Sequence, residues 1–309
     1  YEITTRLVGS EMCIRDSTGT ATHSKKGSKL ETGVKTLPDF MKDATDRNRT
    51  SPFAFTGNKF EFRMVGSKDS ISACNVVLNT ITAEAFKEAC DVLESAEDFD
   101  LAVHDLIKEY ATQHQRIVFN GNGYAPEWEK EARRRGLPVL PSMVDAIPAL
   151  TTDKAVELFG EFGVFTKTEL ESRAEIQYEI YAKAINIEAK TMVDMATKQI
   201  IPAVIKYTTV LAESINQVKA VGPIDVSVQM DLLKKASKLL KEVNSTMNKL
   251  SKLVDQIETH PEGRDRAVFC REKLVPAMEK LREPVDELEM LVDKDMWPMP
   301  SYGDLVFEP

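Results

Sequence analysis

The most regular pattern of apolar and polar residues lies in the last third of the chain. Between Leu233 and Ile257 apolar residues recur at every third or fourth position, and this spacing is typical of a packed helix. After the polar turn at 259–266, a second stripe of the same spacing runs from Leu274 to Val292. Two such helices joined by a short loop predict an antiparallel helical hairpin.

Further long helices are expected before this hairpin. The apolar spacing predicts a helix over about residues 167–221, with a kink at Pro202 and an end at Gly222. Pro276 and Pro284 are expected to bend the second helix of the hairpin for the same reason. Little strand-like alternation follows residue 148, so we expect 148–309 to form a mostly helical domain.

The first half of the chain has a different pattern. Charged and apolar residues alternate strictly at 59–64, which predicts a half-buried strand, and a short apolar run at 116–119 predicts another. Helices are expected at 71–95, with Thr82 as a cap, and at about 99–113. A few strands with helices, followed by a helical extension, make the expected fold class α+β.

The amino terminus carries little information about function. Residues 1–17 (YEITTRLVGSEMCIRDS) resemble a translated sequencing-adapter read, and a disordered native arm is the alternative. We therefore expect 1–17 to be non-native or disordered, and we expect further protein to precede Ser17. Residues 18–50 are polar with little periodicity, which predicts an exposed loop.

Composition excludes several classes of function. The chain has 309 residues, of which 42% are hydrophobic and 29% charged, as in an ordinary globular protein. Its formal net charge of -9 argues against nucleic acid as the main partner, and no apolar run approaches the ~20 residues of a membrane span. The four cysteines and four histidines are dispersed, which favours neither disulfides nor a zinc site. We expect the cytoplasm, or an organelle such as a plastid in a eukaryote.

The strand at 59–64 carries the candidate chemistry. Lys59, Glu61 and Arg63 would share one face of the strand, about 6.6 Å apart at each step. The carboxylate can hold a divalent cation, while the flanking cations bind phosphate or carboxylate oxygens. The alternative is an exposed strand whose charges pair with their neighbours, and the pattern alone favours that alternative.

A family resemblance changes this balance. The block DRNRTSPFAFTGNKFEFRM at 46–64 resembles the segment that joins two active-site strands in glutamine synthetases, where an Asn-Arg pair opens the segment and a basic-x-Glu-x-Arg strand closes it. NRTSPFAFTGNKFEFR is most similar to the class III branch. The similarity continues through GSKDSISACNVVLNTITAE and IVFNGNGY to LVPAMEKLREPVDELEMLVDKDMWPMPSYGDLVF, so it covers about residues 18–309.

The resemblance implies both an architecture and an activity. Residues 18–147 would be the C-terminal part of the catalytic domain, and 148–309 the helical extension. The implied reaction is the ATP-dependent amidation of glutamate by ammonia through γ-glutamyl phosphate, with Mg²⁺ or Mn²⁺. The implied partners are glutamate, ammonia, ATP and further copies of the subunit in a ring.

The resemblance also assigns roles to residues of the block. Glu61 would be a ligand of one catalytic divalent ion. Arg63 would bind glutamate and the transferred phosphoryl group, and Lys59 would meet nucleotide phosphates. Arg49 matches the arginine that stabilises phosphoryl transfer and would also contact ATP.

Two departures from the family pattern limit this assignment. Other classes carry a second arginine five residues after the first, where this chain has Ala54. Either Arg47 replaces it, or the class III site binds its phosphates differently. The family's β-grasp domain, its other metal-binding glutamates, its site histidine and its flap glutamate belong upstream, so we expect the chain alone to be inactive.

Two other functions remain open. The heptads support a non-catalytic helical module for oligomerisation or interaction. The charged strand would also suit another ATP-dependent carboxylate–amine ligase.

Overall fold

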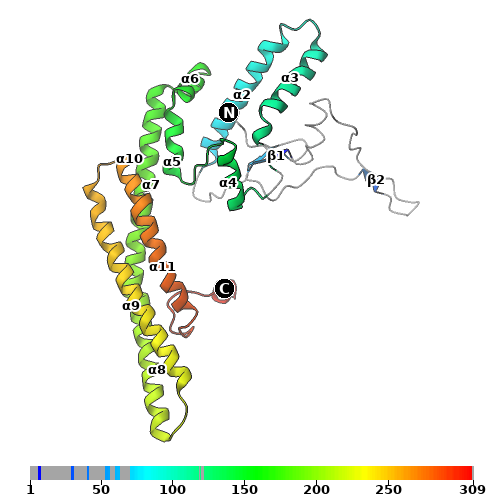
Figure 1. Cartoon of the computed structure of the whole chain (residues 1–309). Coiled ribbons are helices and arrows are strands. Elements are labelled where there is room, and N and C mark those ends of the chain that lie inside the picture. The colour runs from blue at the N-terminus through cyan, green and yellow to red at the C-terminus, as the bar shows by residue number, and fades with distance from the viewer. Residues whose placement is uncertain are drawn as a thin grey trace. The chain divides into compact units, whose positions relative to one another are not determined.

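The computed structural model describes residues 70–117, 119 and 122–307, together with the backbone of short strands between residues 6 and 62 (Figure 1). The chain divides into two compact units. The first contains residues 1–141 and 157–164, and the second contains residues 142–156 and 165–309.

The strands are two or three residues long. In the first sheet β4 (Phe53–Phe55) pairs with the antiparallel β5 (Phe60–Phe62) and with the parallel β1 (Arg6–Leu7). In a second sheet β2 (Lys29–Leu30) pairs with the antiparallel β3 (Phe40–Met41). The strand predicted at 59–64 therefore exists as β5, though it is shorter than the alternation indicated.

Helices make up the described remainder of the first unit. α2 (Ser72–Leu93) packs against α3 (Phe99–Gln113), and the two lie side by side in Figure 1. Asp98 caps α3 because its carboxylate accepts a hydrogen bond from the backbone N–H of Leu101 at 3.1 Å. The cap predicted at Thr82 is wrong, since α2 begins ten residues earlier at Ser72 and the Thr82 hydroxyl donates to the Leu78 carbonyl at 2.7 Å.

The prediction of a strand at 116–119 is also wrong. Gln115–Ile117 form a single 3₁₀ turn, η1, and α4 (Pro126–Arg134) follows. The Arg116 carbonyl accepts a hydrogen bond from Nη1 of Arg135 at 3.0 Å, so this backbone group is satisfied without a sheet partner. Periodicity alone does not distinguish a strand from other structures over so short an apolar run.

The α+β fold class is therefore a wrong prediction. Every regular element in the described residues from Ser70 onward is helical, and the strands before Arg63 are short pairs rather than a layer of the fold. The expectation gave too much weight to two short apolar patterns. Spacing of three and four residues dominates the rest of the chain, and it specifies helices that bury their faces on one another.

The other helices begin at residue 143. Their bounds are α5 (Met143–Ala146), η2 (Ile147–Thr151), α6 (Asp153–Glu161), α7 (Lys167–Met195), η3 (Ala196–Ile200), α8 (Ile201–Val221), α9 (Ser227–Gln256), η4 (Ile257–Thr259), α10 (Arg264–Phe269), η5 (Cys270–Leu274), α11 (Val275–Glu289) and α12 (Tyr302–Phe307).

The long helix predicted over about 167–221 is present as α7, η3 and α8. Thr166 and Glu169 start it with a capping box in which each side chain satisfies a backbone N–H of the other residue. η3 is π-helical and ends two residues before Pro202, as the π-helical η5 ends two residues before Pro276. Proline lacks an N–H and its ring clashes with the carbonyl four residues earlier, so a change in hydrogen-bond register is expected at both positions.

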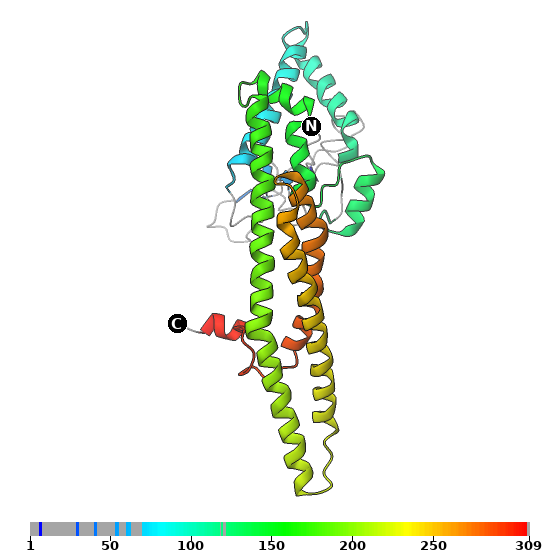
Figure 2. The ribbon, with the colours of Figure 1, turned by 90° about the vertical axis from the view of Figure 1, so that its left-hand side faces the viewer.

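The predicted antiparallel hairpin is confirmed in the second unit. α9 packs against both α8 and α11, and Figures 1 and 2 both show it running alongside them. Val243 and Leu250 of α9 are fully buried, as are Leu281 and Leu288 of α11. Burial of each such leucine contributes about 1.5–3 kcal/mol, so packing between these helices dominates the stability of this unit.

The chain after α11 is fastened to the same core. Met296, Trp297 and Met299 pack against the core cluster. Farther along, Lys294 pairs with Asp304 at 2.8 Å. Within the described part of the chain, no helix has the length and apolar character that crossing a membrane requires.

Candidate functional site

The predicted site begins at the pairing of β4 with β5. Their antiparallel register joins Ala54 to Glu61, with Phe53 opposite Phe62 and Phe55 opposite Phe60. Directly opposed residues of an antiparallel pair lie about 4.5–5.5 Å apart at their Cα atoms. Position 54, where other classes carry an arginine, is therefore adjacent to the predicted metal ligand across the sheet.

The structure does not test the roles assigned to this block. Arg49, Lys59 and Arg63 lie outside the described residues, and for Glu61 only the backbone pairing within β5 is described. Arg47, the alternative for the missing arginine, also lies outside them. The assignments of metal, nucleotide and substrate contacts therefore stay predictions.

The donor chemistry of Glu61 fits a hard divalent cation, because Mg²⁺ and Mn²⁺ prefer carboxylate oxygens. One carboxylate is not a site, however, since such ions take about six ligands. Among residues 70–117, 119 and 122–307, no group of three or more His, Cys, Asp or Glu side chains could hold a metal ion. Glu61 would thus act together with ligands from outside this described part.

The first unit also contains a cluster of aromatic rings and an arginine, which sequence analysis did not identify. The rings of Phe119 and Trp128 stack with their centroids 4.4 Å apart. The guanidinium of Arg135 lies 5.9 Å from the Phe119 centroid and 5.8 Å from that of Trp128. Cation–π contacts and the bond to the Arg116 carbonyl hold Arg135 in place, so the cluster fixes the end of α4.

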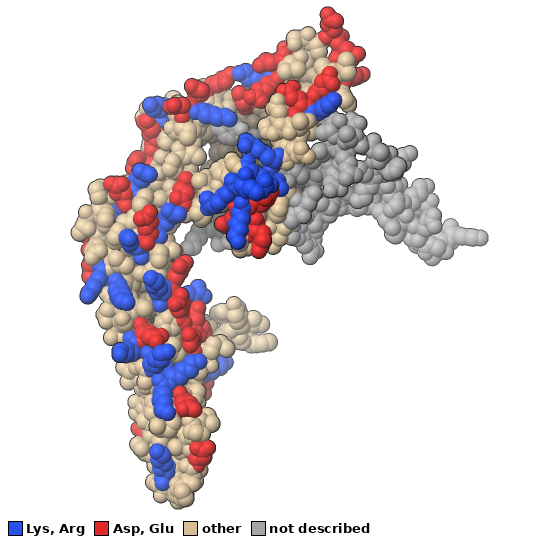
Figure 3. All heavy atoms as spheres, in the orientation of Figure 1, with Lys and Arg blue, Asp and Glu red and all other residues tan. Residues whose placement is uncertain are grey.

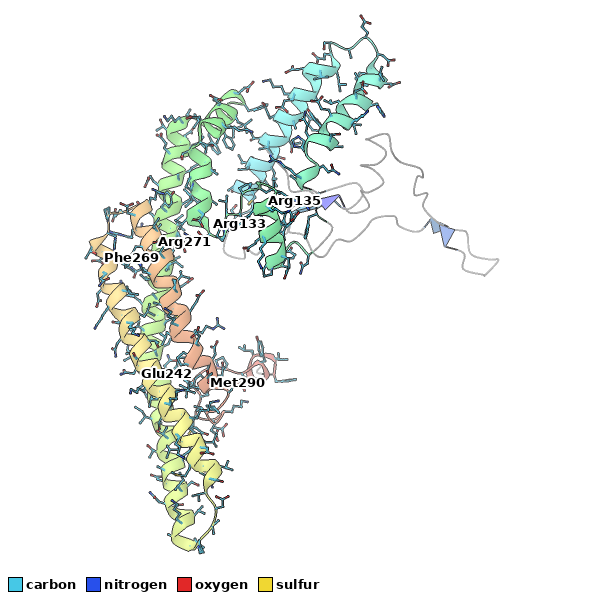
Figure 4. The ribbon with its side chains drawn as sticks, in the orientation of Figure 1. Arg133, Arg135, Glu242, Phe269, Arg271 and Met290 are labelled. Atoms are coloured by element: carbon cyan, nitrogen blue, oxygen red, sulfur yellow. The ribbon has the colours of Figure 1, made fainter. Side chains whose placement is uncertain are left out.

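Acidic and basic residues on α4 form a compact ionic group. Arg134 and Arg135 both donate to the Glu131 carboxylate, at 2.6 and 2.5 Å, and these bonds lower the pKa of Glu131 to about 2. Figure 3 shows Lys and Arg side chains gathered over α4, and Figure 4 labels Arg133 and Arg135 there. Lys130 and the run 133–135 supply this charge.

This basic surface could contact an anionic group. Arg134 and Arg135, however, already bond to Glu131, and Arg135 also contacts the aromatic rings. The run of three arginines was the sequence signal for it. The cluster contains no nucleophile and no acid–base pair, so its geometry supports a structural role better than a catalytic one.

Comparison with known proteins identifies related sequences. A family model described as the glutamine synthetase C-terminal domain matches residues 102–219. The type-3 glutamine synthetase of Dictyostelium discoideum is 36% identical over 286 residues, which cover 90% of this chain and 39% of that protein.

Two bacterial proteins give similar matches. A glutamine synthetase of Bacteroides fragilis is 32% identical over 306 residues, covering 95% of this chain and 42% of that protein. A glutamine synthetase of Butyrivibrio fibrisolvens is 35% identical over 274 residues, covering 87% of this chain and 39% of that protein. The chain therefore spans about two fifths of the length of the curated relatives that it matches.

Proposed function

Because this chain belongs to the glutamine synthetase family and resembles its class III branch, we propose that it is the C-terminal part of a glutamate–ammonia ligase. The whole protein containing it would use ATP to phosphorylate the γ-carboxylate of glutamate, and ammonia would then displace the phosphate. The observation that carries this proposal is the 36% identity with a type-3 glutamine synthetase across 90% of the chain.

We assign the chemistry of this part to the block at 46–64. Glu61 would supply one oxygen ligand to a divalent ion, and Lys59 would neutralise nucleotide phosphates. Arg63 would hold the glutamate carboxylate and the phosphoryl group, while Arg49 would stabilise the charge that develops during transfer. When bound, Mg²⁺ or Mn²⁺ would spread the negative charge of the phosphates.

The same proposal covers organisation and location. Residues 18–147 would complete the catalytic domain, 148–309 would form the helical C-terminal domain, and 1–17 would be a non-native arm, although its Arg6–Leu7 pair with β4 as β1. The whole protein would assemble as a ring of identical subunits in the cytoplasm, or in an organelle such as a plastid.

Assay of phosphate release tests this function. The whole protein should release phosphate only when ATP, glutamate and ammonium are all present, and the 309-residue chain alone should release none. Equal activity with aspartate or another amino acid in place of glutamate would instead indicate a different carboxylate–amine ligase. Activity of the chain alone would contradict the proposal that its site is completed by residues outside it.

The alternative of a helical oligomerisation module loses its main support in the structure. The apolar stripe of α9 is covered within this chain by α8 and α11, and Val243 and Leu250 are fully buried there. A stripe that is buried intramolecularly does not remain as a coiled-coil seam for another subunit. Ring assembly would therefore use other surfaces.

A further inference from the structure

A cavity of about 700 Å³ lies in the second unit. α7 packs against η2 and α10, and residues of these elements line the cavity together with the first turn of α6. This volume is within the range of about 300–1,000 Å³ that is usual for small-molecule sites. Ile147, Ala174 and Tyr178 are its buried lining residues.

Tyr178 has an unused polar group in this cavity. The residue exposes only 5% of its surface, and its hydroxyl forms no hydrogen bond within the described part of the chain. The hydroxyl is not among the fully buried polar atoms that lack a partner in the described residues. It therefore has accessible surface, and a molecule in the cavity that Tyr178 lines could form a hydrogen bond with it.

Charges of both signs surround the same space. Lys167 and Arg264 are its cations, and Asp153, Glu171 and Glu175 are its anions. Lys167 lies 3.8 Å from Glu171. In contrast, Arg264, Asp153 and Glu175 form no ion pair with any residue in the part of the chain that the structure describes.

The backbone at the start of α10 helps to position one of these anions. Gly263 has a φ of +81°, and a Cβ at this position would come within 2.5 Å of Oε2 of Glu175. The positive φ favours glycine at this position, and the missing side chain leaves room for the Glu175 carboxylate beside the chain that carries Arg264. The carboxylate of Glu175 and the guanidinium of Arg264 both border the cavity.

We infer that this cavity binds a small zwitterion, namely a free amino acid with an apolar side chain. Arg264 binds the carboxylate of the ligand, Glu175 and Asp153 bind its ammonium group, and the Tyr178 hydroxyl donates to or accepts from one of them. The apolar lining accommodates the side chain. A simple anion fits less well because acidic residues outnumber basic ones around the cavity, and the two cations argue against a metal ion.

Calorimetric titration of the 309-residue chain tests this inference without any need for catalytic activity. The probes are L-phenylalanine, 3-phenylpropanoate, which lacks the amine, and 2-phenylethylamine, which lacks the carboxylate. We expect L-phenylalanine to bind in the millimolar range, and each analogue to bind at least about tenfold more weakly, because each lacks one charge-assisted contact. No binding of L-phenylalanine, or equally tight binding of either analogue, would overturn the inference.

Variants assign the contacts. Arg264→Gln should weaken the binding of L-phenylalanine by about tenfold and leave the binding of 2-phenylethylamine unchanged. Glu175→Gln should leave the binding of 3-phenylpropanoate unchanged. Tyr178→Phe should weaken the binding of L-phenylalanine by about threefold or more. The control is Arg282→Gln on α11, since Arg282 pairs with Asp286 at 3.1 Å and does not line the cavity. Unaltered affinity in Arg264→Gln, or an equal loss in the control, would contradict the assignment.

Discussion

Ala54 and Glu61 are directly paired across the antiparallel strands β4 and β5. In the classes of glutamine synthetase that carry a second arginine, the resemblance aligns that arginine with Ala54. The register therefore places Ala54, the position at which this chain lacks that arginine, opposite the proposed metal ligand. The carboxylate of Glu61 would thus have no arginine beside it on β4. We propose that this leaves Glu61 available to the divalent ion.

The register itself can be tested by crosslinking. Ala54→Cys with Glu61→Cys should form a disulfide on mild oxidation, because directly opposed residues meet the Cα separation of about 4.4–6.8 Å that a disulfide requires. Peptide mass mapping would identify the crosslink against the background of the native cysteines. The matched control is Ala54→Cys with Phe62→Cys, which is displaced by one residue and directs the second thiol to the other face. Equal crosslinking in both pairs would contradict the register.

Shortening a buried side chain between α9 and α11 should destabilise the second unit, because it leaves an empty space in the core. Leu281 exposes 1% of its surface in the core, whereas Leu305 on α12 exposes 66%. Leu281→Ala should lower the free energy of unfolding by about 2–5 kcal/mol, and Leu305→Ala by less than about 0.5 kcal/mol. Urea denaturation of the two variants measures the difference. Similar losses in both would show that the second unit is not organised around this hairpin.

Trp297 combines an apolar anchor with an unsatisfied polar group. Its ring packs on the core cluster, and its buried Nε1 has no hydrogen-bond partner among the described residues. Trp297→Phe removes that donor while keeping an aromatic ring, so the loss of stability should stay below about 1 kcal/mol. Trp297→Ala should cost about 3–5 kcal/mol because it removes the anchor as well. Denaturant midpoints of the two variants measure these losses of stability. A larger loss in Trp297→Phe than in Trp297→Ala would contradict the role of Trp297 as an apolar anchor.

The ion pair at the last helix predicts a pH effect. The Lys294 ammonium and the N–H and hydroxyl of Ser301 lower the pKa of Asp304 from 3.8 to about 2. Since the pKa is lower in the folded state, the stabilisation is complete above pH 3.8 and is lost as the pH falls through about 2. NMR titration of the Asp304 carboxyl carbon should show the low midpoint. Lys294→Met should return it toward 3.8, and an unchanged midpoint would exclude Lys294 as the main cause.

Sequence patterns predicted the long helices well and the short elements poorly. The stripes ending at Ile257 and Val292 repeat over many turns, and each turn reinforces the same helical phase. The run at 116–119 is too short for such reinforcement, and a side-chain bond from Arg135 satisfies the Arg116 carbonyl in place of a sheet partner. That bond joins residues distant in sequence, so local patterning could not reveal it.

The candidate sites differ in the same way. Glu61 could be proposed from the sequence because its strand carries a specific family motif and alternating residues, and its role stays a prediction. The cavity at Tyr178 could not be proposed in this way, because its lining residues come from four separate elements that meet only after folding. In the sequence, Glu171 and Glu175 form part of an ordinary charged helix face.

The most direct test of the central claim is phosphate release by the whole protein with and without Glu61. Glu61→Ala should reduce the release dependent on ATP, glutamate and ammonium by about 100-fold or more. Glu289→Ala, which alters an exposed carboxylate at the end of α11, should leave it unchanged. Both variants should keep the thermal unfolding midpoint of the unaltered protein. Full activity of a folded Glu61→Ala variant would contradict the claim that this chain contributes Glu61 to a glutamine synthetase active site.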